Sequence, residues 1–138
     1  MSIKVLSELQ VGTVKEDIAA AAKSGSNNQI HDIDFSASHA NYTISVANAA
    51  NNKITFSNLG ADIIGKNGSI IITNPSSVGS LTWNIYTLPT NAFTPGGQGI
   101  AFDTTASKIA IITYFVISST VVLINYAGAF STYPQPTP

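Results

Sequence analysis

From residue 27 onward, hydrophobic residues alternate with polar ones at a spacing of two. This is the pattern of a half-buried β-strand, whose successive side chains point to opposite faces. In the segment 41–47, Tyr42, Ile44 and Val46 share one face and polar residues stand between them. The same pattern predicts strands at residues 29–35, 53–59, 69–73, 81–86, 108–117 and 120–126.

Two pairs of these segments are expected to form hairpins, because only short turns separate them. Asn48-Ala-Ala-Asn-Asn52 separates 41–47 from 53–59, and Ser118-Ser119 joins the last two segments. About eight short strands, without a repeat of roughly 20–50 residues, favour an antiparallel β-sandwich or jelly roll over a solenoid or propeller. The expected fold class is therefore mainly β.

A helical pattern is confined to the first 25 residues. Thr13 and Glu16 have the spacing of a capping box, and Asp17 adds an acid where the helix dipole favours one. The alanine-rich run Ile18-Ala-Ala-Ala-Ala-Lys23 follows, and Gly25 suits the position after a helix. The sequence predicts one short N-terminal helix of about ten residues, which has to pack against other parts of the protein.

The 138 residues fit a single folded domain. We expect an N-terminal arm and short helix at 1–25, a β-sandwich at 26–131 and a flexible proline-rich tail at 132–138. The arm carries apolar residues that are candidates for contact with another protein surface, namely Ile3, Val5, Leu6, Leu9 and Val11.

Charged residues make up only 9% of the chain, against about 25% in an average soluble domain. Interface cores are poor in charge, so partners that cover much of the surface would account for the deficit. A neutral surface rich in hydroxyl and amide groups would account for it equally well. The composition leaves both interpretations open.

Several partner classes are disfavoured. The six basic residues are all lysine and the net charge is −1, so the basic patch that nucleic-acid binding needs is missing. The longest apolar stretch, 109–117, is too short to span a bilayer, and residues 1–8 lack a signal-peptide pattern. Without cysteine, the chain has no disulfide or thiolate zinc site. We expect no nucleic-acid partner, no membrane span and synthesis in a cytoplasm.

Candidate chemistry is sparse. His31, Asp32, Asp34 and His39 have ligand chemistry, but His31 falls on the opposite strand face from the two acids, and a polar strand edge explains the same residues. Asp62 and Asp103 are the acids considered as a catalytic pair. Gly96-Gly-Gln-Gly99 lacks the Lys-Ser/Thr of a phosphate loop and is expected to be a turn. We therefore expect no enzyme activity, metal or cofactor.

Aromatic residues offer one further possibility, a sugar-binding patch. Trp83 alternates in phase with Leu81 and Ile85, which places it in the core. Tyr86 falls on the other face, and with Phe93 it is a candidate for glycan contact.

The region 65–130 carries an ordered series of short motifs. Gly68-Ser-Ile-Ile-Ile-Thr73 opens it, followed by Ser80-Leu-Thr-Trp83 and Phe93-Thr-Pro-Gly-Gly-Gln-Gly99. Then come Thr104-Thr-Ala-Ser-Lys-Ile-Ala-Ile-Ile-Thr-Tyr-Phe-Val116, Ser119-Thr-Val-Val-Leu-Ile124 and Ala129-Phe130. In order and spacing these motifs resemble a module common in tail fibres, head fibres and other virion appendages of tailed bacteriophages. Lys108-Ile109-Ala110 departs from that pattern, which more often has a small residue followed by Val-Asp.

The resemblance implies an antiparallel sandwich that assembles as a homotrimer, and a virion structural protein. It favours a capsid decoration (cement) protein that binds the major capsid protein on the outer surface of the phage head and stabilises it, with the arm up to Val11 as a clasp. The alternative is a tail- or head-fibre module that binds host receptor glycans. An unrelated sugar-binding or adhesion domain is a third interpretation.

Overall fold

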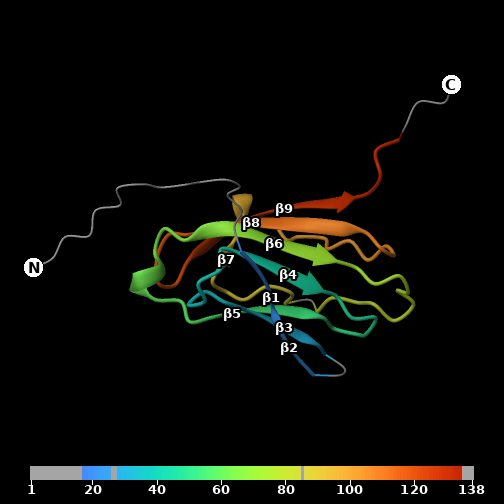
Figure 1. The fold of residues 1–138 in the computed structure, drawn as a ribbon, viewed down its shortest axis with the longest axis horizontal. Coiled ribbons are helices and arrows are strands. Elements are labelled where there is room, and N and C mark those ends of the chain that lie inside the picture. Colours follow the sequence, from blue (N-terminus) through green and yellow to red (C-terminus); the bar gives the residue numbers. More distant parts are fainter. Residues whose placement is uncertain (1–16, 26–27, 85, 135–138) are drawn as a thin grey trace, which may run out of the picture.

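The computed structural model describes residues 17–25, 28–84 and 86–134, which form two packed β-sheets (Figure 1). Sheet A has six strands in the order β1-β4-β6-β8-β9-β7, and sheet B has three in the order β2-β3-β5. The strands are β1 Ile18–Ala20, β2 Ala22–Ser24, β3 Ile30–Asp34, β4 Asn41–Ser45, β5 Lys53–Ser57, β6 Asn67–Thr73, β7 Ala92–Phe93, β8 Ile109–Val116 and β9 Val122–Phe130. Two short 3₁₀ turns, η1 (Ala61–Ile63) and η2 (Pro95–Gly97), complete the elements. The predicted mainly-β, two-sheet architecture is confirmed.

The first half of the sandwich is a two-layer coil. The chain passes from β3 in sheet B to β4 in sheet A, back to β5 in sheet B and again to β6 in sheet A. Each turn of the coil lies parallel to the one before it, so that β3 pairs with β5 and β4 pairs with β6. The antiparallel hairpin β8–β9 then extends sheet A from β6. This hairpin confirms the prediction made for residues 108–126.

Antiparallel pairing, which the sequence predicts throughout, is found in only part of the sandwich. The pairs β1–β4, β4–β6, β3–β5 and β7–β9 are parallel. The predicted hairpin of residues 41–47 with 53–59 is wrong, since β4 and β5 belong to different sheets. The link between them is long enough to cross the roughly 10 Å that separates packed sheets. Asn52 fixes its course by donating hydrogen bonds to the carbonyl oxygens of Ala47 and Ala49 at 3.2 and 3.0 Å.

The predicted helix is wrong wherever the structure describes it. Residues 18–24 form β1 and β2, which join sheet A and sheet B respectively. Pairing with β4 and β3 outweighs the weak helix preference of the alanines, because a helix this short is marginal without tertiary contacts. The proposed capping box, Thr13 and Glu16, lies outside the described residues. Among the described residues, the first strand begins at Ile18, within the segment assigned to the arm and helix.

The core lies between the sheets and is built from alternate residues of each long strand. Phe35 is fully buried and makes edge-to-face contacts with Phe56 and Tyr114, at centroid distances of 5.1 and 5.2 Å. The remaining fully or nearly fully buried apolar side chains are Ile33, Tyr42, Ile44, Val46, Ile54, Ile70, Ile72, Leu81, Ala110, Ile112, Val116, Val122 and Ile124, together with Tyr114. Period-two alternation identified most of these inward positions.

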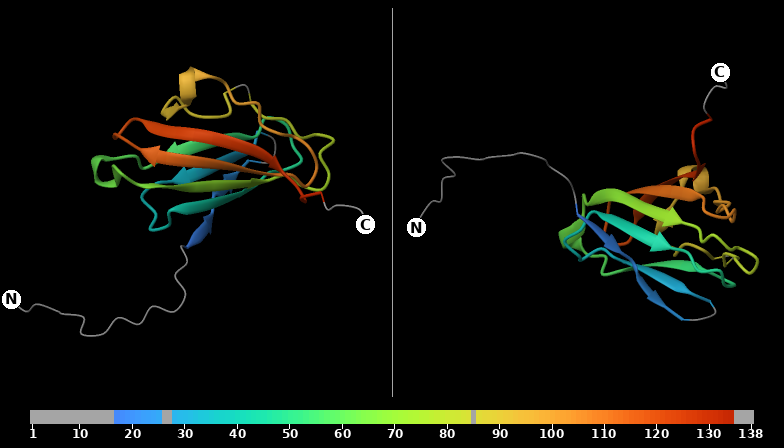
Figure 2. Two further views of the ribbon diagram at one scale, coloured as in Figure 1. Left: turned by 90° about the horizontal axis from the view of Figure 1, so that it is seen from above. Right: turned by 45° about the vertical axis from the view of Figure 1, so that its right-hand side comes forward.

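Sheet B has fewer strands than sheet A, and the segment 81–104 helps to fill the remaining space. Trp83 packs on Phe102 at a centroid distance of 4.7 Å, and Phe102 packs on Tyr126 of β9 at 5.0 Å. Where the structure describes the predicted strand 81–86, it shows a single bridge, between Asn52 and Trp83. Figure 2 shows the part of this segment that carries η2 standing beside β9.

Gly68 provides a test of the packing between β6 and the loop before β4. A Cβ atom at this position would overlap the carbonyl oxygen of Ala40. We expect Gly68→Ala to lower the free energy of unfolding in urea by at least about 2 kcal/mol. Gly79→Ala is the matched control, since nothing lies within 4 Å of a Cβ there. Equal stability of the two variants would contradict the described packing.

Candidate functional site

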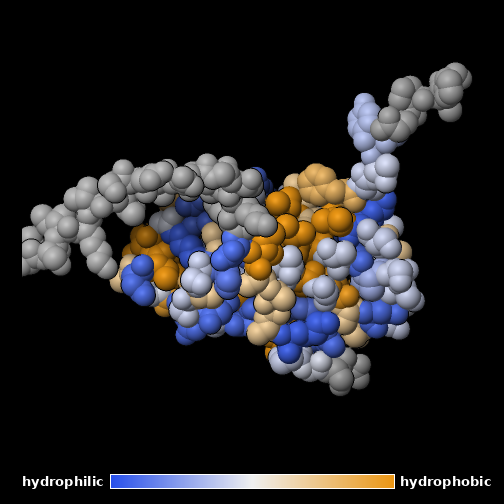
Figure 3. Space-filling model, viewed as in Figure 1, coloured by the Kyte–Doolittle hydropathy of each residue, from blue (hydrophilic) through white to orange (hydrophobic). Residues whose placement is uncertain are grey.

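The outward face of sheet A contains no charged side chain among the described strand residues. Cα partners in neighbouring strands share a face, so the buried residues identify the outward ones on every strand. These outward residues are Ile18, Ala20, Asn41, Thr43, Ser45, Asn67, Ser69, Ile71, Thr73, Phe93, Ile109, Ile111, Thr113, Phe115, Leu123, Asn125, Ala127 and Phe130. In Figure 3 the hydrophobic surface gathers over the upper strands of sheet A.

Three large hydrophobic side chains form a continuous row across this face. Phe115 of β8 pairs with Leu123 of β9, and Leu123 pairs with Phe93 of β7. Their exposed fractions are 45, 43 and 51%. A shallow groove of about 230 Å³ runs beside the row and is lined in part by Thr113 and Asn125. We name Phe93, Phe115 and Leu123 the apolar row.

A second exposed pair, Ile109 and Phe130, lies towards the other end of the same strands. The region between the pair and the row holds Ile111 and Ala127. It also holds hydroxyl and amide side chains, among them Ser69, Thr113 and Asn125. These groups can donate and accept hydrogen bonds without the desolvation cost of a full charge. The composition of the face is that of a surface which another protein can cover.

The outward face of sheet B has the opposite character. Asp32 accepts hydrogen bonds from the hydroxyls of Thr55 and Ser57 at 2.8 and 2.6 Å. Asp34 accepts from the Ser36 hydroxyl at 2.6 Å and from the Asn58 amide at 2.8 Å. These hydrogen bonds, that of Ser36 first, lower the pKa of Asp34. This face carries charged carboxylates that are hydrogen-bonded within the face, so it is suited to contact with water.

The sequence analysis missed the apolar row. Its members come from three strands and are brought together only by strand pairing. One signal was present, because the run 109–117 is apolar at outward as well as inward positions. A strand apolar on both sides needs cover on both sides.

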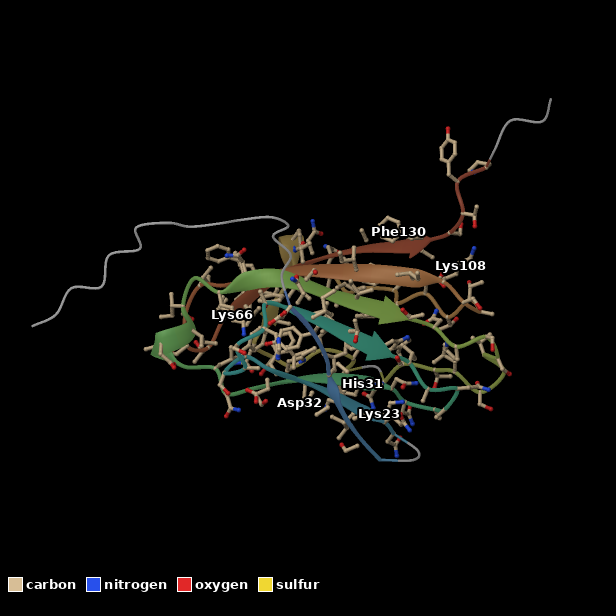
Figure 4. All side chains as sticks on the ribbon, viewed as in Figure 1. Lys23, His31, Asp32, Lys66, Lys108 and Phe130 are labelled. Carbon is tan, nitrogen blue, oxygen red and sulfur yellow. The ribbon has the colours of Figure 1, made fainter. Side chains whose placement is uncertain are left out.

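The proposed ligand cluster is divided by the fold. His31 is buried between the sheets, whereas Asp32 faces outward from sheet B (Figure 4). Asp34 faces outward two residues further along β3. Across the described ranges, no three His, Cys, Asp or Glu side chains are close enough to hold a metal ion. The acids considered as a catalytic pair lie at opposite ends of β6. Asp62 precedes this strand. Asp103 lies beside its other end, where the side-chain amide of Asn74 donates a hydrogen bond to the Asp103 carbonyl oxygen. Seven strand residues, or roughly 23 Å, therefore lie between these two acids.

His31 is held by a defined hydrogen bond. Its Nε2 lies 3.1 Å from Asn52 Oδ1, and Asn52 donates its amide protons to the backbone carbonyls of Ala47, Ala49 and Thr82. The oxygen of Asn52 is therefore the acceptor, and Nε2 of His31 carries the proton. Burial, opposed in part by this bond and reinforced by the charge of Lys23, lowers the pKa of His31.

Lys66 closes the opposite end of the sandwich. Its Nζ donates to the carbonyl oxygens of Phe35 and Ala37, both at 2.9 Å, and to the Tyr42 hydroxyl at 3.0 Å. The ammonium also lies 5.4 Å from the Tyr42 ring centroid. Burial lowers the pKa of Lys66, and burial raises the pKa of Tyr42 to about 12. A cavity of about 330 Å³ beside Lys66 is lined by His39 and Asp62 among others.

The two glycan candidates are placed in different surroundings. Tyr86 is 71% exposed and lines a cavity of about 270 Å³ with Thr87, Gln98 and Phe102. Phe93 is not among the residues that line this cavity and belongs to the apolar row. The glycine-rich segment 96–99 forms a turn, as predicted, in which the Gln98 amide donates to the Pro95 carbonyl. The arm residues Ile3, Val5, Leu6, Leu9 and Val11 lie outside the described residues.

Comparison with protein-family models, with curated proteins and with solved structures finds no match to this chain. No described helix has the length and apolar character required to cross a membrane.

His31 predicts a pH dependence of stability. The unfolded chain binds a proton below the ordinary pKa of 6.5, whereas the folded protein resists protonation. The stabilisation is therefore complete above that value, and it is lost as the pH falls from there through the lowered folded pKa. We expect His31→Gln to lose less stability than the parent between about pH 7 and pH 5 in urea unfolding. His39→Gln, which removes the other histidine of the chain, is the comparison variant. An unchanged slope for His31→Gln would refute this assignment.

Proposed function

We propose that the protein is a non-catalytic structural module that assembles with copies of itself through the outward face of sheet A. The observation that carries the proposal is the apolar row on a face without described charges. Most of the other large exposed apolar residues of the strands, such as Ile109 and Phe130, lie on the same sheet. Contiguous apolar surface of this kind marks protein contact sites.

The dimensions of the face support this role. Six strands about 4.8 Å apart, each with about six residues of roughly 3.4 Å, span a plane of about 600 Å². A standard interface buries about 800 Å² on each partner. Side chains project from this plane and increase its accessible surface area, so the face can supply most of one standard interface. We propose a homotrimer in which each copy turns sheet A towards a shared axis and sheet B towards water.

The setting that we propose for this trimer is the outer surface of a virion. The support is the resemblance of residues 65–130 to appendage modules of tailed bacteriophages. A decoration protein on the phage head, bound to the major capsid protein, fits a small module with one apolar and one polar face. Covering the capsid surface with such trimers would stabilise the shell.

The self-assembly proposal predicts that a charge in the apolar row disrupts the oligomer. Leu123→Glu should convert a trimer, near three times the 14.4 kDa chain mass, to monomer in native mass spectrometry, because the buried charge would be unpaired. Ile30→Glu is the matched control, since Ile30 is 37% exposed on the outward face of sheet B. Monomeric parent protein at micromolar concentration, or equal disruption by both variants, would overturn the proposal.

The cavity beside Tyr86 favours a second candidate function, a fibre module that binds host glycans. An exposed aromatic ring next to hydroxyl and amide groups offers stacking and hydrogen bonding to a sugar. On this hypothesis, Tyr86→Ala should abolish binding to a glycan array. Tyr133→Ala changes another exposed tyrosine, 76% exposed, and should leave binding intact. Absence of glycan binding by the parent would eliminate this candidate.

A further inference from the structure

The edges of the two sheets are protected in different ways. β1 and β7 are only three and two residues long. On sheet B, Lys23 of the edge strand β2 is the Cα partner of the buried His31, and a charge placed this way discourages edge pairing. The β5 edge is covered by the segment 82–87, since the amides of Asn52 and Ile54 donate to Thr82 and Thr87 at 2.9 and 2.7 Å.

The β9 edge lacks these protections. β7 pairs only with Val122 and Leu123, and no other described strand lies alongside residues 124–130 on that side. The sequence of this stretch, Ile-Asn-Tyr-Ala-Gly-Ala-Phe, contains no charge and no proline. A long, uncharged edge of this kind is a template for pairing with another chain.

The hydrogen-bonding groups of this edge are oriented outward. The amide of Val122 donates to the Asn91 carbonyl at 2.8 Å, away from β8. Backbone direction alternates along an antiparallel strand, so the amides and carbonyls of Ile124 and Tyr126 also point away from β8. They point to the side on which β7 ends.

A cavity occupies the position where β7 would continue along β9. It has a volume of about 320 Å³, and Ile124, Asn125 and Tyr126 form its wall on the β9 side. The opposite wall comes from the chain after β7, including Pro95, Gln98 and Gly99. The chain turns away from β9 at η2 (Figure 2), and the cavity is a slot beside the strand edge.

We propose that this slot binds an extended segment by β-strand addition, and that the segment is residues 3–11 of a second copy of the chain. The inference deepens the proposed self-assembly and rests on it. Main-chain hydrogen bonds to the β9 edge would supply affinity, and alternate side chains would supply specificity.

Residues 3–11 have the alternation that a strand needs. Ile3, Val5, Leu9 and Val11 fall at odd positions with Ser7, while Lys4, Glu8 and Gln10 fall at even positions with Leu6. One face of the extended segment is therefore mainly apolar and the other mainly polar. The tail that follows β9 is a poor alternative, because its prolines at 134, 136 and 138 cannot donate backbone hydrogen bonds.

The strand order explains why the segment would come from a neighbour. Residues 3–11 lead into β1, and β1 lies at the opposite edge of sheet A from β7 and β9. When three copies turn sheet A towards one axis, the β1 edge of each copy adjoins the β9–β7 edge of the next. An exchange between unlike edges is head-to-tail, and it closes into a ring when the rotation between copies returns to its start.

Photo-crosslinking of the full chain tests this contact directly. A photoreactive amino acid at Gln98, which lines the slot, should capture the tryptic peptide 5–15. Mixing ¹⁴N- and ¹⁵N-labelled copies should show that crosslinker and captured peptide come from different copies. The same photoreactive group at Gly79 is the control and should not capture this peptide. Capture of a different segment, or capture of peptide 5–15 only from the copy that carries the crosslinker, would overturn the inference.

Blocking the slot is the second test. Gly99→Trp places a bulky side chain in the slot. Gly79→Trp, the control, places the same side chain in a different loop. At both positions no atom lies within 4 Å of the new Cβ. Gly99→Trp should weaken the oligomer at least about tenfold in dissociation constant, and Gly79→Trp should not.

The two readouts separate the inference from the function on which it rests. A trimer that Leu123→Glu disrupts, but that neither captures peptide 5–15 nor responds to Gly99→Trp, overturns the strand addition and leaves self-assembly standing. A parent chain that is monomeric overturns both.

Discussion

Both sides of β8 are apolar, and the rest of the structure follows from how each side is covered. The inward residues Ala110, Ile112, Tyr114 and Val116 are buried between the sheets. The outward residues Ile109 and Phe115 remain more than 40% exposed. Burial of apolar surface contributes about 25 cal/mol of stabilisation for each Å². Covering the outward side of β8 would therefore add further stabilisation. The three strands of sheet B pack against one face of the six-stranded sheet A, so they leave the outward face of sheet A uncovered.

The sequence predicted where most strands lie, but it did not predict how they pair. Period-two alternation locates β3, β4, β5, β6, β8 and β9 and identifies the residues that point inward. It contains no information on which sheet a strand joins, because a strand in either layer presents the same alternation to the same core. The link before β5 has the composition of a hairpin turn. The bonds from Asn52 to Ala47 and Ala49 turn it into a crossover, and the whole coil depends on that crossover.

The same reasoning explains the error over residues 18–23. Alanine-rich sequences favour helix only weakly, by a fraction of about 1 kcal/mol per residue, and tertiary pairing readily outweighs that preference. The candidate site was anticipated only through the low charge of the whole chain. Its location required strand register, since Phe93, Phe115 and Leu123 lie on three different strands and meet as cross-strand partners. The sequence analysis placed Phe93 in a possible glycan contact. Its cross-strand partner Leu123 places it in the apolar row instead.

The unequal edges of sheet A bear on the symmetry of any assembly. A two-fold interface joins identical patches, whereas β1 is a three-residue strand and β9 a nine-residue strand with an open outer edge. Any contact between these edges would therefore be head-to-tail, and it would form a closed ring only when the rotation between copies returns to its start. Turning the outward face of sheet A to the ring axis buries the apolar row and brings unlike edges together in one arrangement. It also leaves the Asp32 and Asp34 side of sheet B in water, where those carboxylates already have their hydrogen bonds. A single cyclic packing thus accounts for the uncharged face, the charged face and the unprotected edge.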